Sequence, residues 1–170
     1  ASVAVTNSLV AHNRTEGNGG GVAVYNAKPL LANCTIVSNE AAGKGGGIWH
    51  DQAGAQVGLT NGIVWYNVAP TGATVYGASG SFLPGWSCAP SPAVTHGVNG
   101  NITNAPMFVS RSEHDYRLQI GSPCINAGTN LAGLVAAADL DGNSRVIFSR
   151  IDMGAYEAHH ASRGTLFSIL

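Results

Sequence analysis

Apolar and polar residues alternate with a period of two along the first part of the chain. In the segment "NCTIVSN", Cys34 and Ile36 would point to one side of the backbone, and Thr35 and Val37 to the other. This is the period of an extended strand, whereas an amphipathic helix repeats every 3.6 residues. The pattern predicts short β-strands rich in Val, Ile and Leu, each ending at Asn or Gly.

The alternating segments recur along the chain. Three copies can be aligned, "VAVTNSLVAHN", "PLLANCTIVSN" and "VGLTNGIVWYN", with offsets of 26 and then 28 residues. Self-similarity at a period of about 20 to 50 residues is typical of stacked repeats, in which each unit packs mainly on its neighbours. Stacking places each strand parallel to its copy, about 4.8 Å away. The sequence therefore predicts a parallel β-helix, or solenoid.

The repeat assigns a position in the coil to each recurring residue type. Asparagine recurs in two columns, which we expect to form ladders at two corners: Asn7, Asn33 and Asn61, and Asn13, Asn39 and Asn67. Glycine triplets at 19–21 and 45–47 would form a third corner, where the chain needs positive φ or room for a neighbouring backbone. The inward columns would be Val5, Leu31 and Leu59, and Val10, Ile36 and Val64.

Several segments resemble known families. The coil "NCTIVSNEAAGKGGGIW" resembles those of right-handed parallel β-helix proteins of the pectate-lyase-like superfamily. The segments "NAPMFV", "DYRLQIGSPCINAGT", "ADLDGNSRV" and "IDMGAYE" are similar to the end of bacterial choice-of-anchor Q domain proteins. The resemblance implies an extracellular or cell-surface location and no particular reaction. The expected fold is all-β, a right-handed parallel β-helix (solenoid) of about three regular coils with an irregular C-terminal cap.

The repeat is lost in the second half of the chain. We expect coils over 1–103, a C-terminal capping region of the same domain over 104–157, and a tail over 158–170. A cap is expected because an open coil exposes unpaired strand edges. The first coil shows no cap, so we expect it to pair with a second copy of the chain or with a segment upstream.

Charge and cysteine content limit the partners. The chain has 8 Lys and Arg against 9 Asp and Glu, so nucleic acid is not an expected partner. No apolar run is long enough to span a bilayer. Cys34 is expected to be a buried, unreactive thiol. Cys88 and Cys124 could pair in an oxidising compartment, which the sequence leaves open.

One outward face carries aromatic side chains beside a carboxylate. Trp49 and Asp51 would point outward from the same strand, with Tyr76 one coil above and Tyr25 one coil below. Sugar rings stack on such aromatics, which makes a polysaccharide or cell-surface glycan the candidate partner. The alternative is that the aromatics only stabilise neighbouring coils by stacking. A second outward stripe, of Leu9, Ala11, Val37, Ile63 and Trp65, would lie under another segment, such as the tail "GTLFSIL", or meet a partner.

Catalytic groups are sparse on the coils. The candidates are Asp51, Glu40 and His50, but the coil carboxylates do not share a column in adjacent coils, as a glycosidase pair would require. The predicted function is a secreted or cell-surface β-helix module that engages polysaccharide, and it could be part of a polysaccharide lyase or glycoside-hydrolase-like protein. The alternative is a non-catalytic adhesin or structural surface solenoid.

The segment "DLDGNSR" offers candidate metal ligands. Asp139, Asp141 and Asn143 alternate as at the start of a calcium loop, but the sixth and twelfth positions of an EF-hand are Ser144 and Arg150. We therefore expect a turn in which Asp139 or Asp141 pairs with Arg145 and no cofactor is bound. A Ca²⁺ site of another kind is the open alternative.

Overall fold

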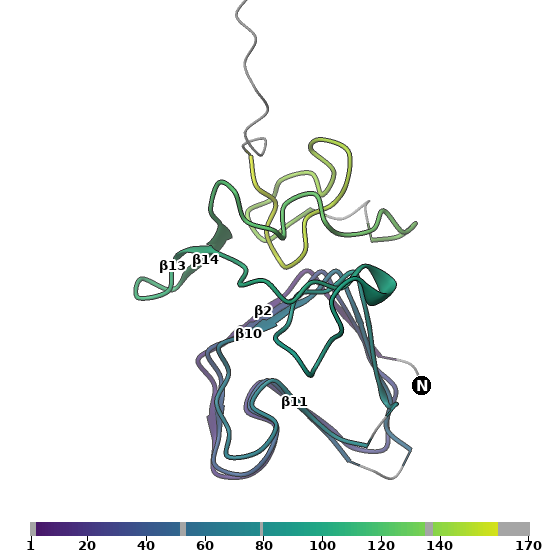
Figure 1. The fold of residues 1–170 in the computed structure, drawn as a ribbon, viewed down its shortest axis with the longest axis vertical. Helices are drawn as coiled ribbons and strands as arrows, with labels where there is room; N and C mark the ends of the chain where they lie inside the picture. The colour runs from purple at the N-terminus through teal and green to yellow at the C-terminus, as the bar shows by residue number, and fades with distance from the viewer. Residues whose placement is uncertain (1–2, 52–53, 79, 135–137, 160–170) are drawn as a thin grey trace, which may run out of the picture.

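A computed structural model of the chain describes residues 3–51, 54–78, 80–134 and 138–159. It is all-β and forms a parallel solenoid of about three coils, as the repeat predicts. Figure 1 looks along the coil axis, where successive coils overlie one another closely. No helix among the described residues is long and apolar enough to cross a membrane.

Each coil contributes strands to the same set of sheets. The first coil holds β1 (Ala4–Thr6), β2 (Leu9–Ala11), β3 (Arg14–Thr15) and β4 (Val22–Val24). The second holds β5 (Leu30–Ala32), β6 (Thr35–Val37), β7 (Glu40–Ala41) and β8 (Ile48–His50). The third holds β9 (Val57–Thr60), β10 (Ile63–Trp65) and β11 (Val75–Tyr76), and β12 (Phe82–Gly85) begins a further turn.

The strand register is the one that the repeat predicts. The sheets are β1-β5-β9-β12, β2-β6-β10, β4-β8-β11 and β3-β7, and all of these pairs are parallel. Leu31 pairs with Val5 and Leu59, and Ile36 with Val10 and Val64. The second- and third-coil members of these columns are buried and form the core.

Both asparagine columns form hydrogen-bonded ladders. The Asn33 Nδ2 donates to Asn7 Oδ1 at 3.0 Å, and Asn61 Nδ2 donates to Asn33 Oδ1 at 3.1 Å. These three residues have φ near +50°, which asparagine tolerates. The second ladder differs, because there the positive φ falls on the preceding residues, His12, Ser38 and Tyr66. The asparagines of the second ladder therefore stabilise the corner through side-chain hydrogen bonds and not through a left-handed backbone conformation.

The glycine triplets answer two separate requirements at the third corner. Gly45 has φ of +70°, a conformation that side chains rarely adopt. A Cβ on Gly46 would lie 2.5 Å from the carbonyl oxygen of Val68 in the next coil. The corner thus combines a left-handed bend with a backbone-to-backbone contact, as the sequence predicts.

The chain leaves the solenoid through a loop that crosses the end of the last coil. Ala89 and Val94 are buried against the interior core of the coils. The short 3₁₀ helix η1 (Val98–Gly100) follows this loop. The loop therefore covers part of the open end.

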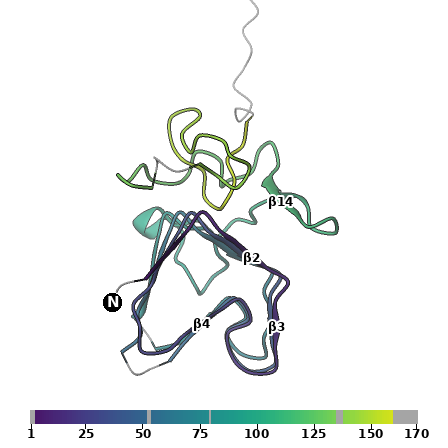
Figure 2. The ribbon, with the colours of Figure 1, turned by 180° about the vertical axis from the view of Figure 1, so that it is seen from behind.

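The C-terminal region lies beside the coils (Figures 1 and 2). It contains the antiparallel pair β13 (Phe108–Ser110) and β14 (Asp115–Leu118) and otherwise consists of turns and irregular segments. It packs on the outward face of β2, β6 and β10, where Val37 and Ile63 are buried with Phe108 and Met153. The apolar stripe is therefore covered by another segment, as expected, but by residues that precede the tail. The tail "GTLFSIL" lies outside the described residues.

Hydrogen bonds fasten the C-terminal region to the second and third coils. The Asn33 Nδ2 donates to the Leu134 carbonyl, and Asn61 Oδ1 accepts from the Thr129 amide at 2.8 Å. The Thr35 Oγ1 accepts from the Ala155 amide at 3.0 Å. The C-terminal region thus covers the apolar outward face of the coils.

A buried ion pair lies inside the C-terminal region. The fully buried Arg145 forms an ion pair with Glu157, with its Nη2 3.1 Å from Glu157 Oε1, and donates to the Gly154 carbonyl at 2.9 Å. Burial, and then the charge of Asp152, raise the pKa of Glu157 to about 8, while Arg145 opposes the shift. The expected pairing of Arg145 with Asp139 or Asp141 is therefore corrected: the guanidinium points inward and meets Glu157.

Candidate functional site

The predicted aromatic face is assembled from three consecutive coils. Trp49 lies on β8, and its partner on the coil above is Tyr76 of β11. Tyr25 follows β4 on the coil below, and its ring centroid lies 4.9 Å from that of Trp49, with the planes tilted by 57°. Because Ile48 is buried in the core, the alternation along β8 turns Trp49 outward. We call Tyr25, Trp49 and Tyr76 the aromatic face.

A cation lies at one edge of the aromatic face. Lys44 comes from the glycine corner, and its Nζ donates to the Tyr76 hydroxyl at 3.1 Å. The same ammonium lies 4.6 Å from the centroid of the Tyr76 ring, within cation–π range. The strand alternation does not predict Lys44 as part of this face, because its position depends on the bend at Gly45.

Asp51 is held in place at the other edge. Its carboxylate oxygens accept the Asn26 amide at 3.0 and 3.1 Å, so the side chain bridges two coils. A cavity of about 260 Å³ lies between the two edges. It is lined by Asn18, Lys44, Trp49, His50, Asp51 and Tyr76. We call it the Trp49 groove.

The three catalytic candidates occupy different environments. His50 is 1% exposed, and a Cβ on Gly77 would overlap its ring, so the imidazole occupies the space above that glycine. Glu40 lies on β7 beside Arg14, 3.8 Å away, in a different sheet from the aromatic face. Asp51 already accepts a backbone amide. The described contacts do not join these three side chains into an acid–base pair.

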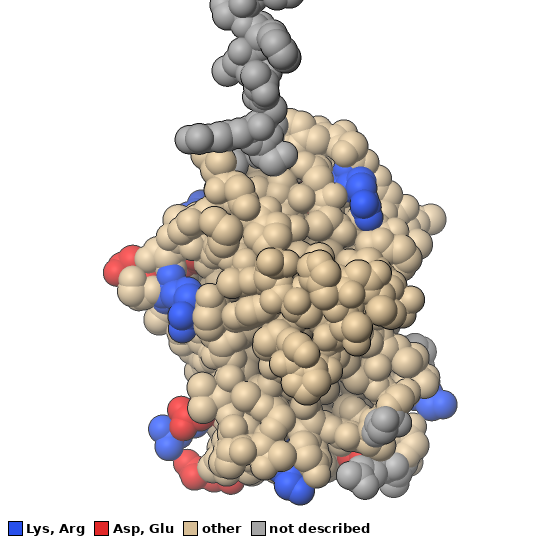
Figure 3. Space-filling view, in the orientation of Figure 1, with Lys and Arg blue, Asp and Glu red and all other residues tan. Residues whose placement is uncertain are grey.

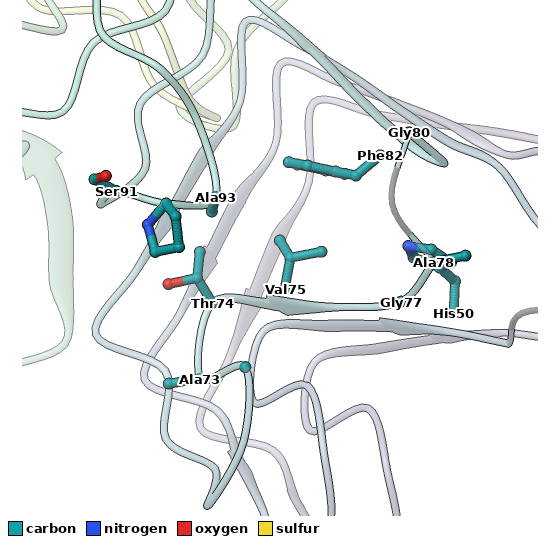
Figure 4. A pocket seen from close by; sticks show the side chains of 12 residues that line it. His50, Ala73, Thr74, Val75, Gly77, Ala78, Gly80, Phe82, Ser91 and Ala93 are labelled. Atoms are coloured by element: carbon teal, nitrogen blue, oxygen red, sulfur yellow. The ribbon is translucent and has the colours of Figure 1, made fainter.

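A larger cavity of about 550 Å³ lies where the chain leaves the coils. In Figure 4, Val75 and Phe82 point into it, and the loop that carries Ser91 and Ala93 forms the opposite wall. Its described lining is His50, Gly72, Ala73, Thr74, Val75, Gly77, Ala78, Gly80, Phe82, Ser91, Pro92 and Ala93. None of these residues is a carboxylate, and most of them are small or apolar residues. The cavity is larger than the Trp49 groove but is lined by fewer polar side chains.

Two histidines and a tyrosine meet between the first coil and the C-terminal region. The ring centroids of His12 and His114 are 3.8 Å apart, and the Tyr116 hydroxyl bonds both His12 Nε2 and the Ser38 hydroxyl. Desolvation, and then the neighbouring His114, lower the pKa of His12. This cluster fastens the β13–β14 pair to the coils.

The candidate calcium ligands form a turn. One carboxylate oxygen of Asp139 accepts the amides of Asp141 and Asn143, and the other accepts the Glu157 amide. These hydrogen bonds outweigh the burial of the group and lower the pKa of Asp139. No group of three or more His, Cys, Asp or Glu side chains that could hold a metal ion occurs in the described part of the chain.

Most of the face shown in Figure 3 is uncharged. Its basic and acidic side chains lie mainly near the edges, and blue and red groups adjoin at the lower left. This arrangement gives no extended basic patch on that face.

Comparison with known proteins finds no family model, curated protein or solved structure that matches this chain. The parallel β-solenoid therefore rests on the strand pairing alone.

Proposed function

We propose that the aromatic face binds a polysaccharide chain, and that the protein is a secreted or cell-surface β-helix module. The observation that carries the proposal is the alignment of Tyr25, Trp49 and Tyr76 across three coils. Neighbouring coils are about 4.8 Å apart, close to the length of one sugar residue, so the face offers a row of ring-sized surfaces. Lys44 and Asp51 add a donor and an acceptor for hydroxyl groups at its edges.

The finer family assignment is also a proposal. The coil and C-terminal segments quoted above support a place among right-handed, pectate-lyase-like β-helices with a choice-of-anchor Q type C-terminal region. This assignment agrees with an extracellular location. It leaves open whether the protein is part of a polysaccharide lyase or glycoside hydrolase.

A glycan array tests the binding proposal. Wild-type protein is compared with the double variant Trp49→Ala, Tyr76→Ala and with Phe148→Ala, which removes an exposed aromatic from the C-terminal region. We expect the double variant to lose about tenfold or more in affinity, since each aromatic contact contributes about 0.5 to 1.5 kcal/mol. The Phe148→Ala control should bind like wild type. Equal binding by all three proteins would refute the proposal.

The second candidate is a non-catalytic adhesin or structural solenoid. It is favoured by the contacts that the same residues make between coils, Tyr25 with Trp49 and Lys44 with Tyr76. Under this alternative, the double variant loses stability and no glycan binds the wild type. Assays for reducing ends and unsaturated products, with neutral and anionic polysaccharides, separate binding from catalysis.

A further inference from the structure

Cys88 lies where the last coil meets the C-terminal region. It continues the column of Ile63 in the β2-β6-β10 sheet, bridges to Ile102, and is completely buried. Its Sγ donates to the Asn104 carbonyl at 3.2 Å, which directs the thiol away from the coil interior and toward the C-terminal region. The Cys88 thiol thus lies at the end of the outward face formed by β2, β6 and β10.

Cys124 approaches the same point from the other side. It is also completely buried, and its backbone is fixed by the Ser122 hydroxyl, which accepts its amide, and by the Met153 amide, which donates to its carbonyl. Both cysteines belong to the apolar cluster that joins β6 and β10 to the C-terminal region. Both are free thiols in the structure, and the Cys88 side chain is among the groups close enough to Cys124 to shift the pKa of its thiol.

We propose that Cys88 and Cys124 form a disulfide that joins the last coil covalently to the C-terminal region. The two cysteines are buried in one apolar cluster, and a disulfide between them needs Cα atoms within about 7 Å of each other. The reaction is thiol–disulfide exchange with a small-molecule or protein disulfide. One S–S bond forms in this chain, the S–S bond of the oxidant breaks, and the oxidant leaves as two thiols that carry the two protons.

Cys34 is the third cysteine and stays a thiol. Its Sγ faces the carbonyls of Val5 and Ala32, at 3.4 and 3.2 Å, within the first two coils. Cys34 is not part of the cluster that holds the other two. Burial raises the pKa of its thiol, which keeps it protonated and unreactive.

Burial also determines when the exchange takes place. It raises the pKa of Cys124 well above its usual range, so this thiol holds little of the reactive thiolate in the folded, reduced protein, and both thiols are shielded from an oxidant. The bond therefore forms while the C-terminal region is still unpacked. Oxidant that is added during refolding should form the disulfide, whereas oxidant that is added to the folded, reduced protein should form it only slowly.

The test uses the full chain, unfolded with reductant and then refolded in a mixture of oxidised and reduced glutathione. Thiols are alkylated after denaturation, and intact mass and peptide mapping locate them. We expect one alkylated cysteine, Cys34, and a crosslinked peptide that contains Cys88 and Cys124. Three alkylated cysteines, or a crosslink to Cys34, would overturn the proposal.

Variants and reduction supply independent readouts. Cys34→Ser should keep the crosslink, whereas Cys88→Ser and Cys124→Ser should each abolish it. Because the bond joins two positions that are 124 − 88 = 36 residues apart in the sequence, reduction should lower the thermal midpoint of the wild type by on the order of 10 °C. This measurement needs no substitution, so it holds even where a variant fails to fold. If reduction of the crosslinked protein left its thermal midpoint unchanged, the disulfide would not stabilise the fold.

Discussion

The Asn39 side chain offers the sharpest test of how the coils are held together. It is fully buried in the middle of the second ladder. Its Oδ1 accepts the amide and the side-chain Nδ2 of Asn13, at 3.0 and 2.9 Å, and its Nδ2 donates to the Val10 carbonyl and to Asn67 Oδ1, both at 2.9 Å. Substitution by alanine removes four hydrogen bonds at once.

The expected loss of stability depends on whether each partner of Asn39 can form another hydrogen bond after the substitution. Asn13 is exposed, so water can replace its lost acceptor, and Asn67 Oδ1 still accepts the Asn39 backbone amide. The Val10 carbonyl is the partner left without this bond. At about 1 kcal/mol for a typical hydrogen bond and about 1 to 3 for a buried group left unpaired, Asn39→Ala should cost about 3 kcal/mol. Asn39 has no positive φ, so backbone strain does not confuse the result.

The assay is urea unfolding followed by tryptophan fluorescence, with Asn13→Ala as the matched control. Asn13 stands at the edge of the same ladder, and its side chain gives one of these bonds, so its loss should cost about 1 kcal/mol. Equal m-values would show that both variants unfold the same structure. If Asn39→Ala cost no more than Asn13→Ala, the ladder would not be a main source of cohesion between coils.

Three further predictions concern other parts of the fold. Gly46→Ala should lower the free energy of unfolding by about 1 to 3 kcal/mol or more, because the new methyl group meets the Val68 carbonyl. Gly17→Ala is the control, since a Cβ there makes only ordinary contacts, and it should unfold at nearly the wild-type urea concentration. Folding lowers the pKa of His12, so its contribution to stability is fully present above about pH 6.5 and is lost as the pH falls. The decrease in thermal midpoint between pH 7.5 and 5.5 should therefore be smaller in His12→Asn than in the wild type. An equal decrease in both proteins would show that His12 is not the source of the pH dependence. Above about pH 8, where Glu157 is ionised, Arg145→Met should cost about 3 kcal/mol or more by leaving that carboxylate buried without its partner. Arg117→Met, at an exposed pair with Asp115, should leave the urea midpoint nearly unchanged in the same assay.

The coils could be predicted from the sequence because their geometry repeats. Offsets of 26 and 28 residues place Asn33 over Asn7 and Asn61 over Asn33 without any knowledge of distant contacts. The same register places Trp49 beside Tyr76, so the aromatic face follows from the pattern alone.

The C-terminal region could not be placed in this way. Its position depends on contacts such as that of Ala155 with Thr35, 120 residues apart, and no period in the sequence relates the two. The inward turn of Arg145 toward Glu157 has the same origin, since it depends on how an irregular segment folds over itself. Lys44 was missed for a local reason, because a glycine bend, and not a strand, directs it to the Tyr76 ring.

The lateral attachment of the C-terminal region has a consequence for repeat number. It is bound to defined positions on the second and third coils, through Asn33, Thr35 and Asn61. An extra coil inserted between these two would shift the attachment points apart by about 4.8 Å and break the match. A coil added before the first would leave every one of these attachment points where it is, so this attachment permits the solenoid to lengthen on that side.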